Sequence, residues 1–338
     1  MKRVIIRSFG RPETMCVESF AAPAVGAQEV MIEVSASGIN FSDLVIRLGI
    51  YPDGPELPFV PGYEVAGRIV ESGQDVTEFK VGDRVFATLP SGGYATHVVC
   101  PTDRLFRVPP LMSDEEAAVI ANSYLTAWVA VDRLAGVRGG ETVAIHSAGG
   151  GVGLAALQIC LARGARVIAL SSESKHARLQ FFGADVCVDP SKDNVPARLR
   201  QLTNGKGVDV ILDSTGGKSY RESYDSLSLL GRLVLLGGAG AITESGASPL
   251  QLARFWHPTV RIEPITLMTA NKSISGLHLP ALWSRYEICV TGIAEVLALY
   301  ESGHVMPIID SVFALEDAAQ AHRHIHSRRN FGKVVLRP

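Results

Sequence analysis

The stretch AIHSAGGGVGLAALQICLARGARVIAL, residues 144–170, decides the predicted fold. An apolar strand runs into a glycine-rich loop, an apolar helix follows the loop, and a second apolar strand begins at Arg166. A glycine-rich turn between a strand and a helix is the setting of a dinucleotide-binding loop; the alternative is a flexible turn without a ligand. In the register Ala148-x-Gly150-x-x-Gly153, Gly150 would let the backbone approach a pyrophosphate. Gly153 would let the helix pack closely on the strand.

The chain around this stretch alternates strands and helices from residue 141 to residue 277. Buried apolar strands that alternate with helices predict a doubly wound parallel sheet, with KSISGLHL as a further strand and YRESYDSLSLLG as a helix. Residues 1–110 are instead rich in short β-branched runs separated by Gly, Pro and Asp. A capping-box spacing at Ser113 and Glu116 predicts the start of the first long helix. The predicted fold class is therefore α/β, with a β-rich domain ahead of the doubly wound one.

The second strand of the stretch leads into ALSSESKH, where the two nicotinamide cofactors can be distinguished. An NAD site places an Asp or Glu here, which bonds the ribose 2′-hydroxyl. Ser171 occupies this position, and its hydroxyl can donate to a 2′-phosphate that a carboxylate would repel. Lys175 adds a positive charge nearby, whereas Glu173 is unfavourable. The pattern favours NADPH over NADH; the alternative is that Ser171 caps the next helix and Lys175 is a solvated surface residue.

Charge and composition exclude several classes of function. The formal net charge is −2, which gives no electrostatic support for a nucleic-acid or membrane-phosphate partner. No apolar run reaches the ~18 residues of a membrane span, and the first residues lack the apolar region of a signal peptide. The five cysteines are isolated, without a C-x-x-C pair, so neither a disulfide framework nor a cysteine-rich zinc site is expected. The expected setting is the reducing cytoplasm.

Longer segments resemble the medium-chain dehydrogenase/reductase superfamily, and within it the zinc-free quinone oxidoreductase branch. The resemblance covers essentially the whole chain. It is carried by GINFSDLVIRLGIYP, PGYEVAGRIVESGQDVTEFKVGDRVFA, LTAW, HSAGGGVGLAALQ, KGVDVILDSTGG and NFGKVVL. Within the branch, the chain is most similar to the vesicle amine transport protein group in SSESKHARL, LMTANKSISGLHL and ALYESGHVMPIIDSVFALEDAAQA.

The resemblance implies a split organisation. A GroES-like β-barrel catalytic domain is expected from residues 1–122, a Rossmann NADP-binding domain from 123–279, and a return segment that completes the catalytic domain from 280–338. The active site is expected in the cleft between the two domains. Relatives also form homodimers by extending the Rossmann sheet at an edge strand, which is KSISGLHL here.

The same resemblance argues against a catalytic metal. Zinc alcohol dehydrogenases of the superfamily have a cysteine ligand at the position of Asn40, and a histidine ligand in the motif that here is Gly62-Tyr63-Glu64. The four-cysteine structural zinc loop is also missing. Asn and Tyr bind zinc poorly, so the chemistry is expected to be metal-free.

Without a metal, side-chain donors must stabilise the enolate that forms when a hydride adds to an enone. Asn40 can offer an amide N–H, and Tyr51 a phenol that can also supply a proton. Tyr63 is a further candidate to face the substrate, whereas Asp43 is expected to orient the barrel loop. The alternatives are that Asn40 bonds its own backbone in a turn and that the tyrosines are ordinary packing residues.

By position, the resemblance also assigns cofactor contacts. Beyond Gly150 and Gly153, they are Thr126, Gly151, Val152, Gly237, Gly238 and Asn330. The pair Phe255–Trp256 is the candidate wall of the substrate pocket. The run AHRHIHSRR, which holds His322, His324 and His326, is expected to be solvated surface rather than a metal site.

Three functions are left open. The first is an NADPH-dependent, zinc-independent reductase of quinones or α,β-unsaturated carbonyls, which would act on a small molecule. The second is an enoyl reductase that acts in trans on a carrier-bound acyl or polyketide thioester. The third is a non-catalytic, NADPH-binding protein associated with vesicles, against which the lack of a basic amphipathic helix argues.

Overall fold

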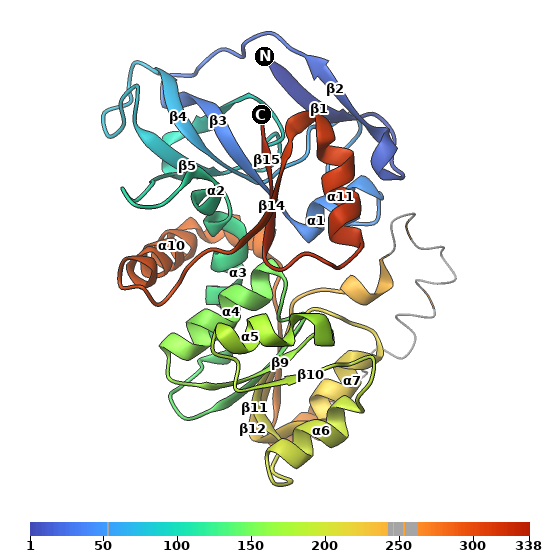
Figure 1. Cartoon of the computed structure of the whole chain (residues 1–338). Helices are drawn as coiled ribbons and strands as arrows, with labels where there is room; N and C mark the ends of the chain where they lie inside the picture. The colour runs from blue at the N-terminus through green and yellow to red at the C-terminus, as the bar shows by residue number, and fades with distance from the viewer. Residues whose placement is uncertain (53, 243–245, 247–252, 254–262) are drawn as a thin grey trace. The chain divides into compact units, whose positions relative to one another are not determined.

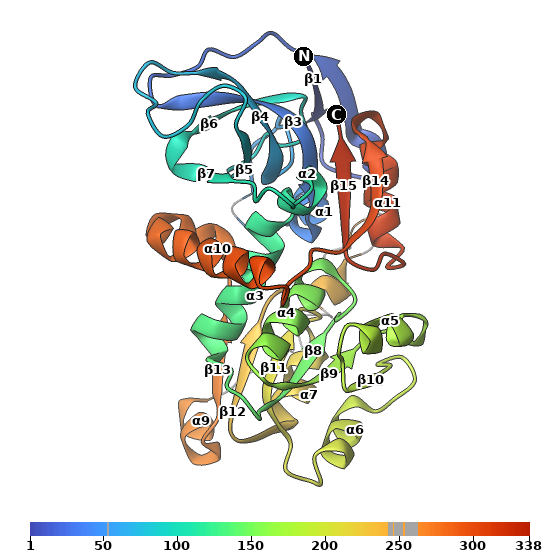
Figure 2. The same ribbon diagram turned by 60° about the vertical axis from the view of Figure 1, so that its left-hand side comes forward.

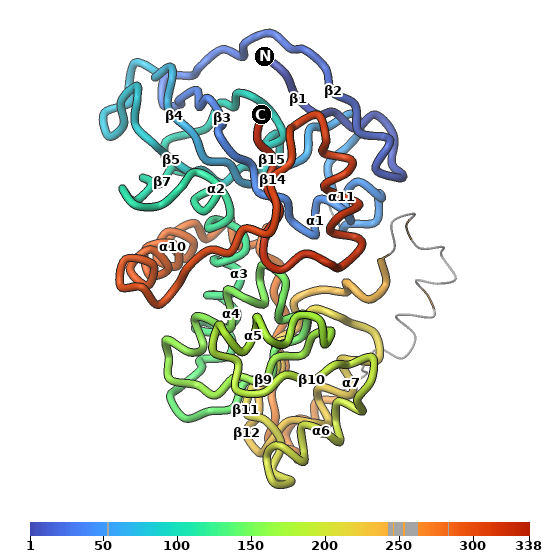
Figure 3. The backbone as a smooth tube through the Cα atoms, viewed as in Figure 1, coloured from blue at the N-terminus to red at the C-terminus, as the bar shows by residue number. Residues whose placement is uncertain are grey.

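The chain divides into two compact units (Figure 1). The computed structural model describes residues 1–52, 54–242, 246, 253 and 263–338. The first unit contains Met1–Ser123 and Pro307–Pro338, so both ends of the chain lie in it, as Figure 3 shows. The second unit contains Tyr124–Ile242 and, in its described C-terminal part, residues 263–306.

The first unit is built on a seven-stranded sheet. Its strands in spatial order are β14 (Ile309–Ala314), β15 (Lys333–Arg337), β3 (Glu29–Ile39), β4 (Glu64–Ser72), β5 (Arg84–Thr88) and β7 (Leu105–Arg107), with β6 (His97–Pro101) also paired to β3. Outside this sheet are the antiparallel pair β1 (Lys2–Ile6) and β2 (Met15–Ser19) and the helices α1 (Phe41–Arg47), α2 (Asp114–Ala117) and α11 (Ala318–His326). The C-terminal strand β15 runs antiparallel beside β3, so the end of the chain completes a sheet that its first third begins (Figure 3).

The core of this sheet follows from the alternation of apolar residues along its strands. Val30, Ile32 and Val34 are spaced two residues apart in β3 and are buried in one cluster. Val65 and Ile69 of β4 belong to the same cluster. Side chains two residues apart in a strand point to one face of the sheet, so this spacing builds a continuous apolar layer.

The second unit is a doubly wound sheet, as predicted, in which all neighbouring strands are parallel. Its strands in spatial order are β10 (Val186–Val188), β9 (Arg166–Leu170), β8 (Thr142–His146), β11 (Val208–Asp213), β12 (Leu227–Leu235) and β13 (Ser273–Gly276). The helices are α3 (Leu125–Trp128), α4 (Gly151–Ala162), α5 (His176–Phe181), α6 (Val195–Leu202), α7 (Lys218–Asp225), α9 (Pro264–Ala270) and α10 (Tyr286–Glu301). The strand β13, predicted from KSISGLHL, forms one edge of the sheet (Figure 2). The α/β fold class is confirmed.

The order in which successive strands are added to the sheet reverses at β8, with β9 and β10 on one side of it and β11 and β12 on the other. Right-handed crossovers therefore place α4 and α5 on one face of the sheet and α6 and α7 on the other. Figure 1 shows α6 and α7 next to each other. Across the described residues, no helix has both the length and the apolar character needed to cross a bilayer.

The capping box at the start of the connecting segment is confirmed. The backbone N–H of Ser113 donates to Oε2 of Glu116 at 2.8 Å, and the backbone N–H of Glu116 donates to Oγ of Ser113 at 3.2 Å. The helix that follows is not uniform, because π-helical turns at Ile120–Tyr124 and Val129–Ala135 flank α3. It ends at Gly136, which adopts the left-handed conformation with φ 56°.

The predicted helix YRESYDSLSLLG is shorter than expected, because α7 ends at Asp225 and β12 begins at Leu227. The Ser226 hydroxyl donates to the carbonyl of Glu222 at 2.7 Å, a local bond that competes with helix continuation. The last residues of the predicted helix instead begin β12, because this strand pairs with β11 on one side and with β13 on the other.

The predicted return of the chain to the first unit at residue 280 is too early, because the first unit resumes only at Pro307. Helix α10 stays with the second unit. A Cβ on Gly292 of α10 would lie 2.6 Å from the ring of Trp128 in α3, and the indole N–H of Trp128 donates to Glu295 at 3.0 Å. Such close packing on α3 makes α10 part of the unit that contains α3.

The turn between β8 and α4 explains why the glycine motif can begin with alanine. Ser147 has a positive φ of 53°, whereas Ala148 does not have a positive φ. Gly153 approaches the backbone so closely that a Cβ would lie 2.5 Å from the oxygen of Ser147 and 2.7 Å from the Cα of Ala148. The packing of α4 on the end of β8 therefore requires glycine at position 153.

Replacing Gly153 by Ala should destabilise the protein by about 1–3 kcal/mol, because the added methyl group meets backbone atoms that cannot rotate away. Urea unfolding followed by circular dichroism measures the change. The matched control is Gly139→Ala, whose methyl group would lie 3.4 Å from the nearest atom, the carbonyl oxygen of Arg163. Equal unfolding midpoints for the two variants would contradict the required close approach.

Candidate functional site

The N-terminus of α4 has the geometry of an anion site. Gly150 is the N-cap, and no side chain caps the helix there. Gly151 and Val152, the first two helical residues, are half-buried. The first amide groups of a helix lack carbonyl partners within it, and the helix dipole favours negative charge near them. This geometry fits the pyrophosphate contact predicted for residues 150–153.

Ser171 lies directly after the end of β9 and is buried. Ser172 begins a short 3-10 helix, Glu173–Lys175, but its side chain makes no capping hydrogen bond. The Ser171 hydroxyl likewise makes no hydrogen bond within the part of the chain that the structure describes. The structure therefore does not support capping by these serines, and the Ser171 hydroxyl is available to a ligand.

The unfavourable charge of Glu173 is compensated by a lysine that the sequence alone does not single out. Lys192, in the loop after β10, forms an ion pair with the Glu173 carboxylate, which lowers the pKa of Glu173. Asp189 adds a second carboxylate, which accepts the backbone N–H of Glu173 at 2.9 Å. Lys175, half-buried in the same loop, adds a second positive charge to this region, which also contains Asp193 near Lys192.

The other predicted cofactor residues occur in both units. Thr126 is half-buried in α3, and Gly237 and Gly238 follow the end of β12. Asn330 belongs to the first unit, where its amide donates to the carbonyl of Gly332 at 2.9 Å. This bond shapes the loop before β15, and the cofactor contact of Asn330 stays a prediction.

Asn40 is buried in the first unit and held by two charged side chains. Its Nδ2 donates to Oε1 of Glu64 at 3.0 Å, and its Oδ1 accepts from Nζ of Lys333 at 2.6 Å. These bonds fix the orientation of the amide, because only its oxygen can face an ammonium group. The second Nδ2 hydrogen has no acceptor among the described residues. The side chain of Asn40 is thus held in one orientation at the N-cap of α1.

The ion pair of Lys333 and Glu64 is buried and fully hydrogen-bonded. Nζ of Lys333 lies 3.1 Å from Oε1 of Glu64 and also donates to the carbonyl of Ile39 at 2.7 Å. With Oδ1 of Asn40, each of its three hydrogens has an acceptor. The second oxygen of Glu64 accepts the backbone N–H of Asn122 at 2.8 Å. A network in which every buried group is satisfied holds its members in one arrangement.

Asp43, fully buried in α1, joins two loops of the candidate site. Its carboxylate accepts the backbone N–H of Asn40 at 2.7 Å and that of Gly62 at 3.2 Å. Burial raises the pKa of Asp43 to about 7, against the lowering effect of these two N–H donors. Asp43 therefore orients the loop, as the sequence predicts.

Tyr51 and Tyr63 are brought together by a shared apolar support. Both pack against a small buried cluster formed by Ile6, Ile46 and Phe59. Burial raises the pKa of each phenol above its usual value, and the charge of Asp43 acts in the same direction. Both tyrosines are therefore protonated at neutral pH and can act as hydrogen-bond donors.

The side chains of Asn40 and Tyr63 do not suit zinc, which prefers Cys, His, Asp and Glu. Among the described residues, no group of three such side chains converges on a point where a metal ion could bind. The candidate wall of the substrate pocket, Phe255–Trp256, lies outside the described residues.

The histidine run of α11 is not all solvated surface, which corrects the prediction from the sequence. His322 is fully buried, and His326 is half-buried. His324 lies 2.7 Å from Oδ2 of Asp310. The helix buries one face against the core of the first unit, and His322 is on that face because its Nε2 lies 3.1 Å from the hydroxyl of Tyr94. Because arginines lie close to His322 in the sequence, an exposed position was expected and this burial was not predicted.

The sequence alone does not single out Lys333, Glu64 or His322 as parts of a polar network. The strongest available signal is NFGKVVL, in which a lysine begins an otherwise apolar strand. A charged residue in a buried strand needs a partner, so this lysine could have been identified as half of an ion pair.

Comparisons with known proteins agree with this architecture. Two family models match, the alcohol dehydrogenase GroES-like domain over residues 26–110 and the zinc-binding dehydrogenase over residues 182–336. The chain is 34% identical to the synaptic vesicle membrane protein VAT-1 homolog of Rattus norvegicus over 341 residues, which cover 100% of this chain and 84% of the relative.

Two solved structures are similar over the full chain. Escherichia coli quinone oxidoreductase complexed with NADPH has a TM-score of 0.88 and 28% identity, with 100% of both chains covered. The CurK enoyl reductase has a TM-score of 0.85 and 26% identity, with 99% of this chain and 98% of that chain covered. The protein therefore belongs to the medium-chain dehydrogenase/reductase superfamily, with a GroES-like domain and a Rossmann domain.

Lys333→Met should destabilise the protein by about 3–5 kcal/mol, because it leaves the buried carboxylate of Glu64 unpaired. Adding Glu64→Gln should recover part of this loss, and urea unfolding of the single and double variants forms a double-mutant cycle. The control is Lys2→Met, whose ion pair with Glu316 is exposed and should contribute less than about 1 kcal/mol. Strictly additive losses in the cycle would show that the buried pair is not coupled.

Proposed function

We propose that the protein is a zinc-independent, NADPH-dependent reductase of quinones or α,β-unsaturated carbonyls. The observation that carries this proposal is the oriented amide of Asn40. It has one N–H donor without a partner among the described residues, at the position where zinc-dependent members of the superfamily have a cysteine ligand. A fixed donor can polarise a carbonyl oxygen in place of a metal ion.

The proposed cofactor is NADPH, bound by the second unit. The available hydroxyl of Ser171 supports this choice, as does Lys192, which offsets the charge of Glu173. The similar quinone oxidoreductase of Escherichia coli was solved with NADPH. The proposed contacts are Thr126, Gly150, Gly151, Val152, Gly153, Ser171, Lys175, Gly237, Gly238 and Asn330.

The side chains of the first unit supply the remaining chemistry. When bound, NADPH supplies a hydride. Reduction of an enone at its β-carbon leaves negative charge on the carbonyl oxygen, which the N–H of Asn40 stabilises. The contact of Lys333 with Oδ1 polarises the amide and makes this N–H a stronger donor. Tyr51, protonated at neutral pH, is the proposed proton donor, and Tyr63 is proposed to line the substrate pocket.

Mixing the purified protein with NADPH and a panel of quinones and enones tests the proposal through the rate of NADPH oxidation. Asn40→Ala should lower kcat by about 10²–10³-fold, the loss typical of one oxyanion donor. Tyr51→Phe should lower kcat by about 10²-fold. Both variants should bind NADPH normally, and treatment with EDTA should leave the wild-type rate unchanged. Tight NADPH binding without turnover of any compound in the panel would overturn the proposal.

Two alternative functions are supported by the comparisons. Similarity to the CurK enoyl reductase favours reduction of an enoyl group, which we propose as an alternative with a carrier-bound acyl or polyketide thioester as substrate. Faster turnover of an acyl thioester than of any free enone would establish that function. Similarity to the VAT-1 homolog, a synaptic vesicle membrane protein, favours association with vesicles. Liposome binding without turnover would establish the non-catalytic function. The five free cysteines fit a reducing, cytoplasmic setting.

We also propose that the protein is a homodimer formed through β13. Leu229 and Leu230 of β12 are 73% and 68% exposed, and Ile265 and Met268 of α9 are 58% and 71% exposed. The backbone N–H of Leu230 donates to the carbonyl of Asn271 at 2.9 Å, so these apolar side chains gather near the start of the edge strand β13. An edge strand with apolar neighbours is suited to pairing with a second copy of the sheet.

The double variant Leu229→Asp/Met268→Asp should convert the dimer into a monomer, because two carboxylates would be buried without partners in the interface. Analytical ultracentrifugation measures the mass in solution. The control is Leu111→Asp, which changes a 93% exposed side chain in the first unit and should leave the dimer intact. A monomeric wild-type protein would contradict this proposal.

A further inference from the structure

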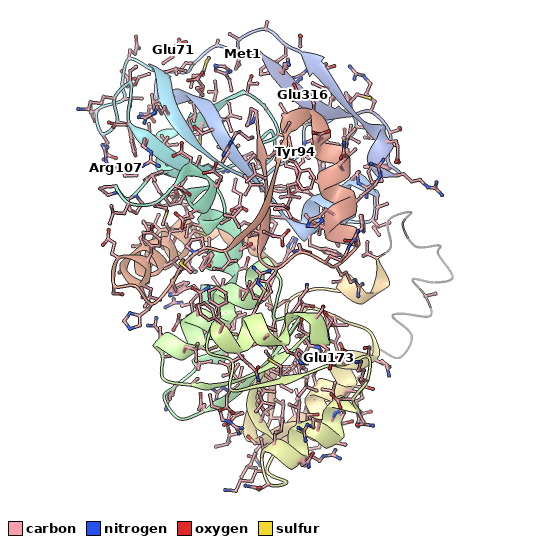
Figure 4. The ribbon with its side chains drawn as sticks, viewed as in Figure 1. Met1, Glu71, Tyr94, Arg107, Glu173 and Glu316 are labelled. Carbon is pink, nitrogen blue, oxygen red and sulfur yellow. The ribbon has the colours of Figure 1, made fainter. Side chains whose placement is uncertain are left out.

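A chain of hydrogen bonds runs through the interior of the first unit from Arg47 to Tyr94, close to Asp43. Nε of Arg47 donates to Nδ1 of His322 at 3.3 Å, and Nε2 of His322 lies 3.1 Å from the hydroxyl of Tyr94. Burial raises the pKa of the Tyr94 phenol, and the carboxylate of Asp43, which lies near its hydroxyl, raises this pKa further. All four residues are buried, and Figure 4 shows Tyr94 beside α11, the helix that carries His322.

Arg47 fixes the direction of every bond in this chain. A guanidinium group only donates, so Nδ1 of His322 accepts and the ring hydrogen is on Nε2. That hydrogen is donated to Tyr94, so the hydroxyl hydrogen of Tyr94 must point to an acceptor other than His322. A second nitrogen of Arg47 lies 2.9 Å from Nε2 of His326, which accepts for the same reason.

Both histidines are neutral at pH 7. Burial lowers the pKa of His322 well below its usual value, and the nearby Arg47 guanidinium lowers it further. Burial and the same guanidinium lower the pKa of His326 to about 4. The polarity of the chain is therefore constant over the physiological pH range, and the nearby carboxylate of Asp43 is the group that titrates.

We infer that His322 is a positioning residue for the candidate site. It directs the hydroxyl hydrogen of Tyr94 away from itself and toward the nearby carboxylate of Asp43. The carboxylate of Asp43 in turn holds the backbone N–H groups of Asn40 and Gly62. This inference rests on the proposed function, because the donor held in place is the amide of Asn40. His322 acts through the other residues of the chain and does not touch the reacting atoms.

The charge of Asp43 determines how firmly the chain holds the site. The titratable and charged groups that face it are Tyr51, Tyr63, Tyr94, Glu64 and Lys333. Burial raises the pKa of Asp43 to about 7, and Glu64 adds to this effect; the bonds from Asn40 and Gly62 and the charge of Lys333 oppose it. The ionised carboxylate accepts more strongly, so kcat should fall as the pH drops through the pKa of Asp43.

Four variants separate positioning from a merely structural role. His322→Gln retains an acceptor for Arg47 and a donor for Tyr94, whereas His322→Phe removes both. Tyr94→Phe removes only the hydroxyl that lies near Asp43. The control is His304→Gln, which changes an exposed histidine of the second unit.

With NADPH and the best substrate of the panel at pH 7, H322F and Y94F should lose about tenfold in kcat, with an unchanged KM for NADPH. The acid limb of their pH profiles should move upward by about one pH unit, because a carboxylate that loses a donor binds its proton more tightly. H322Q should stay within about twofold of wild type, and H304Q should match it. If H322F does not fold, Y94F and H322Q still decide the question.

Titration of Asp43 itself needs no substrate. Carbon-13 NMR of aspartate-labelled protein, with Asp43→Asn for assignment, should show a higher Asp43 pKa in H322F and Y94F than in wild type. This result would support the inference even if the wild-type protein reduces no compound, in which case only the proposed function fails. An unchanged Asp43 pKa in folded H322F and Y94F would overturn the inference, as would an H322Q variant as impaired as H322F.

Discussion

A single buried ammonium group holds together the polar network around Asn40 in the first unit. Lys333 enters the core at the start of β15, where it is surrounded by acceptors from Ile39, Asn40 and Glu64. A charge at this depth is tolerated only when its hydrogens are bonded, so the end of β3 and the starts of β4 and β15 must keep their positions. The same contacts leave the amide of Asn40 only one orientation. The contacts of Lys333 therefore both stabilise the first unit and hold the N–H donor of Asn40 in place before a substrate binds.

The two units contribute different kinds of chemistry. In the second unit, backbone groups form the candidate cofactor site. Gly153 allows α4 to begin directly at the end of β8, and the N-terminal amides of α4 have no side-chain cap. In the first unit, side chains dominate. Asp43 holds the loops of Asn40 and Gly62 by their backbone, and Tyr51 lies on an apolar support nearby. Neither arrangement requires a metal ligand at position 40 or position 63.

The parts of the fold that depend on local pattern could be predicted from the sequence. The strand, loop and helix of residues 144–170 and the capping box at Ser113 follow from short-range spacing alone. Contacts between distant residues could not be predicted in the same way. Lys333 and Asn40 are 293 positions apart, and so the network that orients the candidate donor has no local signature. For the same reason the burial of His322, and the assignment of α10 to the second unit, were not apparent.

The proposed reaction is a metal-free hydride transfer to a substrate whose carbonyl oxygen accepts a hydrogen bond from the oriented amide of Asn40. It can be tested by a single turnover of metal-stripped protein with an enone and with NADPH that carries deuterium at both positions of C4 of the nicotinamide. Mass spectrometry should find deuterium at the β-carbon of the product, at the same rate before and after chelation, and Asn40→Ala should slow the transfer without changing its position. A product without deuterium, or a transfer that occurs only after zinc is restored, would contradict the claim.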